Sequence, residues 1–155
     1  MSAQASVGLD AWARLLHAYA STTRALSGSL LAEHGLTLND YEALLRLSRA
    51  EDGRMRRVDL AEEVLLTASG VTRLLDGLEE AGYVERAACS TDRRVVYAVI
   101  TDAGRDKLEA ASESHLAEVR ALFDERFGPE ELEQLAELLG RLPGAESAAG
   151  EDCGA

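Results

Sequence analysis

The stretch that decides the fold is TASGVTRLLDGLEEAGYVERAACSTDRRVVYAVIT, residues 67–101. Thr67 suits the N-cap of a helix over residues 68–81, in which apolar side chains recur at helical spacing. Two β-prone runs follow, at 83–88 and 95–101, joined by a polar segment. The pattern predicts a helix followed directly by a β-hairpin with a charged tip.

The residues before this stretch extend the pattern. Thr37 begins a capping-box-like sequence that predicts a helix to about Ser48, and residues 55–64 indicate a short strand and then a short helix. Two short helices around a tight turn and then a hairpin form a winged helix-turn-helix, whose second helix enters the DNA major groove. The predicted fold class is therefore mainly α, with a small β-hairpin wing.

Heptad patterns at both ends of this region predict a dimer. The first helix carries Leu9, Trp12, Leu16, Tyr19, Thr23, Leu26 and Leu30 at alternating spacings of three and four, and the last carries Leu132, Leu135, Leu139 and Leu142. Such a seam requires a partner helix. We therefore predict a homodimer with a helical dimerisation domain (1–36 and 106–144), a winged helix-turn-helix lobe (37–105) and a disordered acidic tail (145–155).

The composition suits one helical domain, and its charge distribution permits DNA binding. The chain has 155 residues, 46% of them hydrophobic, and a net charge of −12. Residues 106–155 hold 13 acidic and 4 basic residues, whereas residues 54–105 hold 9 and 8. The acidity is thus mostly C-terminal. No apolar run approaches the roughly 20 residues of a membrane span, so the expectation is a soluble cytoplasmic protein without a membrane partner.

Several other classes of site are disfavoured. Cys89 and Cys153 lie in no CxxC or Cys/His cluster, and the three histidines have no metal-ligand spacing. The chain has no phosphate-binding glycine loop and no nucleophile elbow. We therefore expect no metal, no cofactor and no enzymatic activity.

Two groups of side chains are candidates for DNA contact. Opposite the core face of the 68–81 helix lie Ser69, Thr72 and Arg73. The acidic residues Asp76, Glu79 and Glu80 lie toward the C-terminal end of the helix, farther from a duplex met by its first turn. The alternative for each group is an ordinary solvated surface.

The hairpin tip is the second candidate. Asp92 directly precedes Arg93 and Arg94. Asp92 can pair with one neighbouring arginine and hold it, leaving the other guanidinium for the minor groove, where the negative potential attracts arginine.

The residues from 59 to 108 closely resemble the MarR (multiple-antibiotic-resistance regulator) family. The resemblance is carried by LA at 60–61, SGVTRL at 69–74, LEEAGYV at 78–84, DRR at 92–94 and TDAG at 101–104, and extends more weakly over 9–142. It implies a homodimer on palindromic double-stranded DNA, more often a repressor than an activator.

The same resemblance assigns roles to individual residues. Ser69, Thr72 and Arg73 would be recognition-helix contacts, Arg93 and Arg94 wing contacts, and Asp92 the residue that orients the wing. The sequence departs from the family at Val58, where many relatives have a Ser or Thr cap, so Asp59 or solvent must serve those amides.

The resemblance also implies a small aromatic or acidic effector. Trp12, His17, Tyr19 and Tyr41 are polar-tipped aromatics on the first two helices that could line its pocket, with core packing as the alternative.

Two further alternatives stay open. One is a winged-helix protein-interaction module that does not bind DNA, which the net charge would permit. The other is a redox sensor through Cys89, with Arg86, Arg93 and Arg94 lowering the thiol pKa. Against the second, peroxide-sensing relatives place their reactive cysteine in the first helix.

Overall fold

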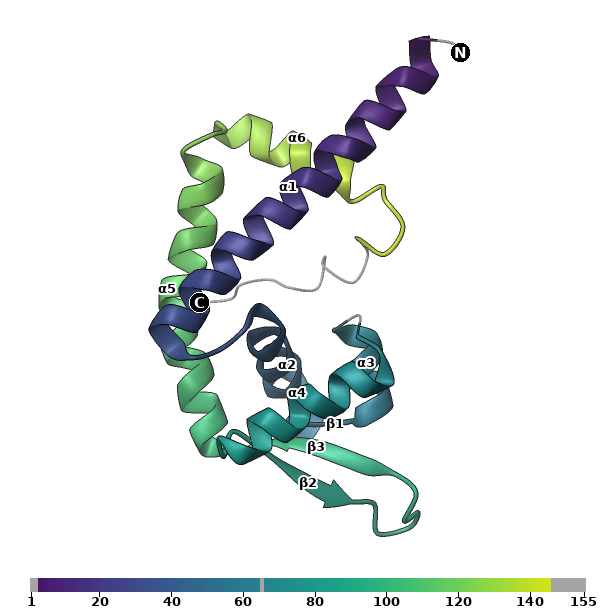
Figure 1. Cartoon of the computed structure of the whole chain (residues 1–155), viewed down its shortest axis with the longest axis vertical. Helices are drawn as coiled ribbons and strands as arrows, with labels where there is room; N and C mark the ends of the chain where they lie inside the picture. The colour runs from purple at the N-terminus through teal and green to yellow at the C-terminus, as the bar shows by residue number, and fades with distance from the viewer. Residues whose placement is uncertain (1–2, 65, 146–155) are drawn as a thin grey trace. The chain divides into compact units, whose positions relative to one another are not determined.

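The computed structural model describes residues 3–64 and 66–145. The fold is mainly α with a small antiparallel sheet, as the sequence predicts (Figure 1). The elements in chain order are α1 (Ala3–His34), α2 (Leu38–Arg49), the 3-10 turn η1 (Glu51–Gly53), β1 (Arg54–Arg56), α3 (Arg57–Glu63), α4 (Ala68–Glu80), β2 (Val84–Ala88), β3 (Val96–Ile100), α5 (Asp102–Asp124) and α6 (Pro129–Leu139).

The chain divides into two compact units, Met1–His115 and Leu116–Ala155, with the boundary inside α5. The first unit contains α1, the predicted winged helix and the first half of α5. The predicted split into dimerisation domain, DNA-binding lobe and tail stays a prediction. All of the tail except Ala145 lies outside the described residues.

The core of the first unit joins every helix of the winged region to the sheet. Its fully buried leucines come from α1, α2 and α3, namely Leu30, Leu44, Leu47 and Leu60. The helix α4 adds Val71, Leu75 and Leu78, and the sheet adds Val84, Ala98 and Ile100. This shared core holds α4 and the hairpin on one scaffold.

The sheet has three strands in the order β1-β3-β2, with both pairings antiparallel. Ala98 on the central strand pairs with Met55 on β1 and with Arg86 on β2. The predicted strand and hairpin therefore form one sheet. The wing is hydrogen-bonded to the strand that leads directly into α3.

The predicted helix boundaries follow from local caps. Thr37 forms a capping box with Asp40, and the Thr67 hydroxyl accepts a hydrogen bond from the Gly70 amide at the start of α4. Gly35 and Gly82 follow α1 and α4 with positive φ values of 69° and 82°, a conformation that suits glycine. These caps fix where α4 starts and ends.

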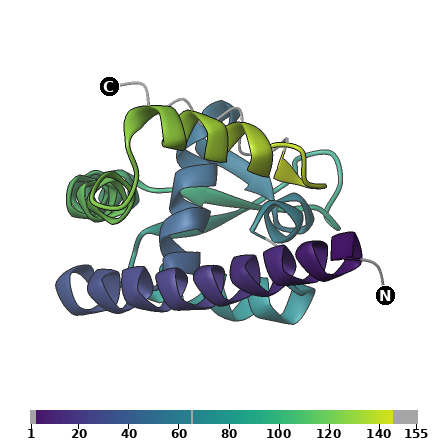
Figure 2. The same cartoon turned by 90° about the horizontal axis from the view of Figure 1, so that it is seen from above.

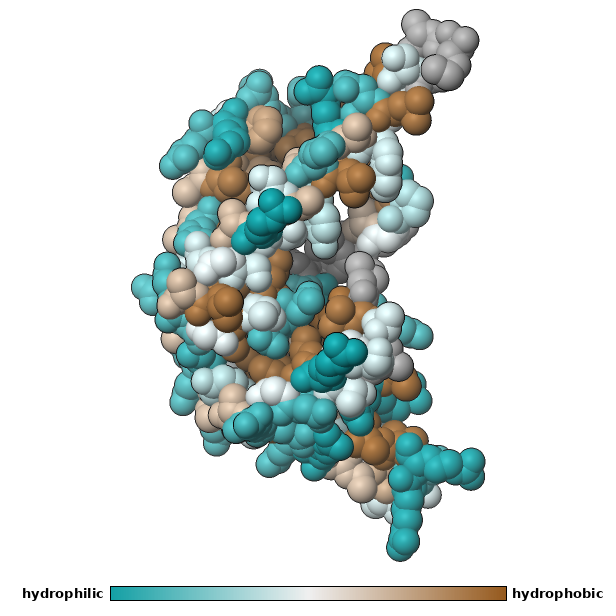
Figure 3. Space-filling view, in the orientation of Figure 1, coloured by the Kyte–Doolittle hydropathy of each residue, from teal (hydrophilic) through white to brown (hydrophobic). Residues whose placement is uncertain are grey.

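The helix α1 is a single uninterrupted helix, which Figure 2 shows from the side. Several large apolar side chains of its N-terminal half are exposed, namely Val7, Leu9, Trp12, Leu16 and Tyr19. Brown, hydrophobic atoms mark this half of the helix in Figure 3. Within the described residues, no helix is long and apolar enough to cross a membrane.

Candidate nucleic-acid interface

The helix α4 separates its core face from the predicted contact face. Val71, Leu75 and Leu78 are buried, whereas Ser69, Thr72 and Arg73 are exposed. The N-cap Thr67 also lies within 3.2 Å of the Ser69 hydroxyl, oxygen to oxygen. The first two turns of α4 therefore present a small, polar and cationic surface.

A contact between the two helices fixes one residue of this surface. Arg57, the first residue of α3, donates a hydrogen bond from Nη2 to Oγ1 of Thr72 at 3.0 Å. Arg57 and Thr72 are 15 positions apart in the sequence, and no local pattern indicated the pairing. The bond connects the start of α3 to the exposed face of α4.

The start of α3 has no cap from the side chain of its N-cap residue. Arg56 occupies the N-cap position and makes no side-chain capping bond. The Asp59 carboxylate accepts two hydrogen bonds from the Arg56 guanidinium, at 2.7 and 3.1 Å. This ion pair raises the pKa of Arg56. The departure at Val58 is therefore accompanied by an Arg–Asp pair.

Asp92 accepts the hydrogen bonds that shape the tip of the wing. Its Oδ1 accepts a hydrogen bond from the Arg94 backbone N–H at 3.0 Å, and its carbonyl accepts one from the Val95 N–H at 3.1 Å. The carboxylate lies 3.9 Å from Nε of Arg94, whose side chain is 96% exposed. Asp92 therefore holds the backbone of the tip more closely than it holds a guanidinium.

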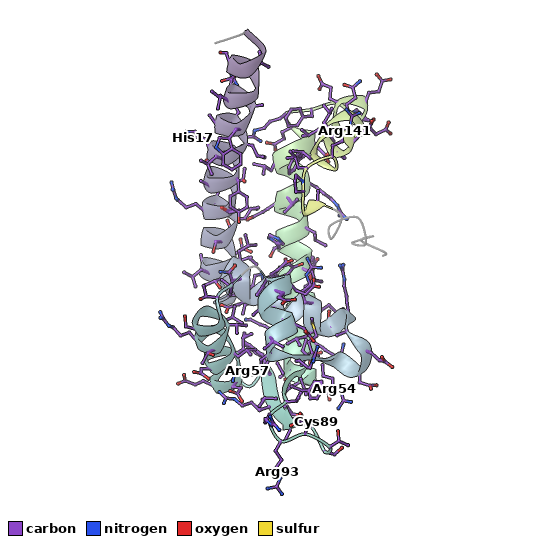
Figure 4. The ribbon with its side chains drawn as sticks, turned by 90° about the vertical axis from the view of Figure 1, so that its right-hand side faces the viewer. His17, Arg54, Arg57, Cys89, Arg93 and Arg141 are labelled. Carbon is purple, nitrogen blue, oxygen red and sulfur yellow. The ribbon has the colours of Figure 1, made fainter. Side chains whose placement is uncertain are left out.

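Arg93 extends away from the hairpin at the very end of the wing (Figure 4). It is exposed, like Arg94. The two arginines therefore form a cationic tip.

Sequence reasoning missed a link between the wing and α4. Arg86 on β2 donates from Nε to Glu79 at 2.7 Å and from Nη2 to Asp76. Glu79 first, and then Asp76, raise the pKa of this guanidinium. Two of the three acidic residues on the C-terminal half of α4 are thus paired with a base.

A hollow of about 520 Å³ lies between α3, α4 and the base of the wing. Its walls are aliphatic and its rim is basic, with Arg56, Arg57, Val58, Ala61, Val71, Thr72, Arg94, Val95 and Val96 lining it. Nearby, the Arg54 guanidinium lies 4.9 Å from the centre of the Tyr97 ring. Basic side chains of β1, α3 and the wing therefore surround the contact face of α4.

Cys89 directly follows β2, at the start of the loop that joins β2 to β3 (Figure 4). Its Sγ is 3.2 Å from the Thr91 hydroxyl. Hydrogen bonds from the Thr91 side chain, and then from the Thr91 and Asp92 backbone, lower the thiol pKa, while the Asp92 charge opposes them. The predicted lowering of the pKa is present, but attributing it to arginines was wrong.

The structure places the four predicted pocket residues on α1 and α2. Tyr41 is 4% exposed, and its hydroxyl lies 3.0 Å from the Ser112 hydroxyl. Its ring packs 4.6 Å from that of His115, centroid to centroid. Tyr41 therefore packs in the core of the first unit.

The other three residues lie on the exposed face of α1. Trp12, His17 and Tyr19 are exposed. Tyr19 lines a shallow hollow of about 300 Å³ with Ala20, Thr23, Arg24, Ser27, Thr37, Leu38 and Asn39. In the described part of the chain, no group of three or more His, Cys, Asp or Glu side chains is placed to hold a metal ion.

An exposed polar helix after a short helix, with a cationic wing beside it, defines a winged helix-turn-helix protein. The MarR family model matches residues 34–95. The structure is similar to that of AbsC, a MarR family transcriptional regulator from Streptomyces coelicolor, with 35% identity, 92% and 95% of the two chains covered, and a TM-score of 0.78. It is also similar to Sco3205 of the same organism, a MarR family regulator solved in complex with DNA, with 26% identity, 90% and 85% covered, and a TM-score of 0.79.

Two curated relatives come from Bacillus subtilis. The transcriptional repressor YetL is 31% identical over 111 residues, 72% of this chain and 66% of that protein. The transcriptional regulator MhqR is 30% identical over 110 residues, 71% of this chain and 74% of that protein. The chain belongs to the MarR family of DNA-binding helix-turn-helix transcriptional regulators, which are not enzymes.

Proposed function

We propose that the protein binds a palindromic double-stranded DNA site as a homodimer, with α4 in the major groove and the wing in the adjacent minor groove. The observation that carries the proposal is the exposed stripe of Ser69, Thr72 and Arg73 beside a wing that ends in Arg93 and Arg94. Hydroxyl and guanidinium groups of this kind read base edges, and arginine suits a narrow minor groove. The Sco3205 complex with DNA supports this docking by likeness.

The homodimer is supported by the apolar residues that α1 leaves uncovered. Trp12 is 60% exposed and Tyr19 66% exposed, although both belong to the predicted heptad seam. Leu138 and Leu139 at the end of α6, and Leu142 just after it, are also exposed. A second copy would bury these surfaces, and its two-fold axis would match a palindromic site.

Repression is the regulatory effect that we propose, since YetL is a named transcriptional repressor. A dimer bound across a promoter would block transcription while it stays bound. An effector that lowers its affinity for DNA would then induce the target gene.

For the effector we propose a small aromatic or acidic compound near Tyr19. The hollow there combines an aromatic ring with the Arg24 side chain and the polar side chains of Thr23 and Ser27. An aromatic ring and a carboxylate would each find a matching group. Tyr41 is buried and does not line this hollow.

The test of the proposed function begins with selection of bound duplexes from a random-sequence pool. We expect the selected duplexes to share an inverted repeat with half-sites about one helical turn apart, about 10 base pairs, bound by one dimer. Footprinting should then show protection of both half-sites. A protein that enriches no sequence and binds all duplexes equally weakly would instead be the interaction module.

A further inference from the structure

Arg86 is an arginine of the wing whose donor groups point back to the recognition helix. Its Nε and Nη2 bind Glu79 and Asp76, one turn of α4 apart. The Arg86 side chain is 49% exposed, and those of Asp76 and Glu79 are 54% and 25% exposed. This arrangement joins β2 to the C-terminal half of α4 through one guanidinium.

The two carboxylates lie close to the surface that would meet DNA. Asp76 follows Thr72 by four residues and Arg73 by three, so it continues the same exposed stripe. Four residues correspond to about 6 Å along a helix axis. This is shorter than the screening length of about 8 Å at physiological salt, so a bare charge at Asp76 would act on phosphates near Thr72.

Arg86 differs in this respect from Arg73 and Arg93, two of the arginines predicted to contact DNA. Within the described part of the chain, Arg73 and Arg93 form no ion pair, whereas Arg86 has a carboxylate on each of two donor nitrogens. Two of the three guanidinium nitrogens of Arg86 are therefore directed to carboxylates of α4, and its positive charge is shared with both acids. In this position the positive charge of Arg86 offsets the repulsion that Asp76 and Glu79 would both exert on DNA phosphates.

We propose that Arg86 is a positioning residue for DNA binding, which acts by neutralising Asp76 and Glu79 on α4 and not by contacting DNA. The inference rests on the proposed function. It explains how a recognition helix with acidic residues on its exposed face can approach a polyanion.

The experiment compares full-length variants by fluorescence anisotropy on a labelled duplex selected with the wild-type protein. Arg86→Gln should weaken binding by about 10-fold at low salt, with a smaller loss as salt rises and screening shortens. The triple variant Asp76→Asn/Glu79→Gln/Arg86→Gln carries no charge at the three positions and should bind within about threefold of the wild type. Thermal melting checks that each variant is folded.

A matched control separates local from global charge. Arg86→Gln combined with Glu130→Gln and Glu133→Gln has the same net charge as the triple variant, but its two negative charges are removed from exposed residues of α6. We expect this control to bind as weakly as Arg86→Gln alone. Equal rescue by both triple variants would overturn the inference, since overall charge alone would then explain the loss.

Two other results would also overturn it. Wild-type affinity in Arg86→Gln would show that the acids need no neutralisation, and a triple variant as weak as Arg86→Gln would show that Arg86 contacts DNA itself. Neither of these two results would contradict the proposed function. A wild-type protein that selects no duplex would instead reject the proposed function, and this inference with it.

Discussion

Asp92 accepts a hydrogen bond from the backbone N–H of Arg94 at 3.0 Å, while its carboxylate lies 3.9 Å from Nε of the same arginine. An aspartate that bonds the amide two residues ahead forms an Asx turn. The turn reverses the chain at the wing tip, where Arg93 points outward (Figure 4). Asp92 therefore shapes the loop that presents the cationic tip.

Replacing Asp92 should separate its charge from its hydrogen bond. Asp92→Ala removes both, and we expect weaker DNA binding although a negative charge is lost. Asp92→Asn keeps an oxygen that can accept from the Arg94 amide, and should retain most of the affinity. Anisotropy at two salt concentrations gives the comparison. Tighter binding by Asp92→Ala would mean that the carboxylate only repels DNA.

Arg73→Ala should weaken specific binding by about 1–3 kcal/mol, the usual contribution of a side chain that reads a base edge. Arg73 is exposed on α4, so the fold should be unaffected. Affinity is to be measured on the selected site and on duplexes changed at one base pair of each half-site. If the variant loses the same factor on every duplex, Arg73 binds the backbone and reads no base.

Trp12→Glu should break the homodimer. The substitution places a charge in the predicted seam of α1, at a ring that is 60% exposed in the single chain. Ser21→Glu is the matched control, because Ser21 is exposed on the same helix but lies outside the heptad positions. Sedimentation at micromolar concentration should give a monomer for the first and a dimer for the second. A dimer in both would remove the N-terminal seam from the interface.

Gly104→Ala should destabilise the fold. A methyl group at Gly104 would collide with the carbonyl oxygen of Tyr83 and lie 2.9 Å from Cγ1 of Ile100. The cost of such overpacking is about 1–3 kcal/mol. Gly77→Ala on α4 is the control, since open space surrounds that position and alanine favours a helix by about 1 kcal/mol. Urea denaturation should shift the two midpoints in opposite directions.

Alkylation should reveal the lowered pKa of Cys89. A thiol whose pKa is lowered is deprotonated at a lower pH, so the rate of reaction with iodoacetamide should rise earlier than that of an ordinary cysteine. The measurement uses Cys153→Ser, which leaves Cys89 as the single thiol. Thr91→Val removes the hydroxyl beside Sγ and should move the midpoint of the profile upward. An unchanged profile in Thr91→Val would contradict the assigned cause.

The winged helix could be predicted because its signals are local. The apolar spacing on α4, the caps at Thr37 and Thr67, and the β-prone runs around the wing each act over a few residues. The exposure of Thr72 and Arg73 follows from the same periodicity. Local rules therefore account for the elements and for the contact face.

The parts that could not be predicted depend on tertiary packing. Arg57 reaches Thr72, and Arg86 reaches Asp76, only because α3 and β2 pack beside α4. Tyr41 resembles a pocket residue in the sequence, yet its position on α2 places its ring in the core. Pairings of this kind depend on which side chains meet in space, and residue type alone leaves several partners open.

Because β3 is the central strand of the sheet, the loop at the wing tip can vary in sequence without disturbing the rest of the fold. Pairing with β1 on one side and β2 on the other sets the register of β3 independently of the loop between Ala88 and Val96. Insertions, deletions or charge changes in this loop can therefore accumulate without shifting α4. If α4 and the wing dock on DNA as proposed, evolution or design can alter minor-groove preference at the tip and base reading on the helix as two separate traits.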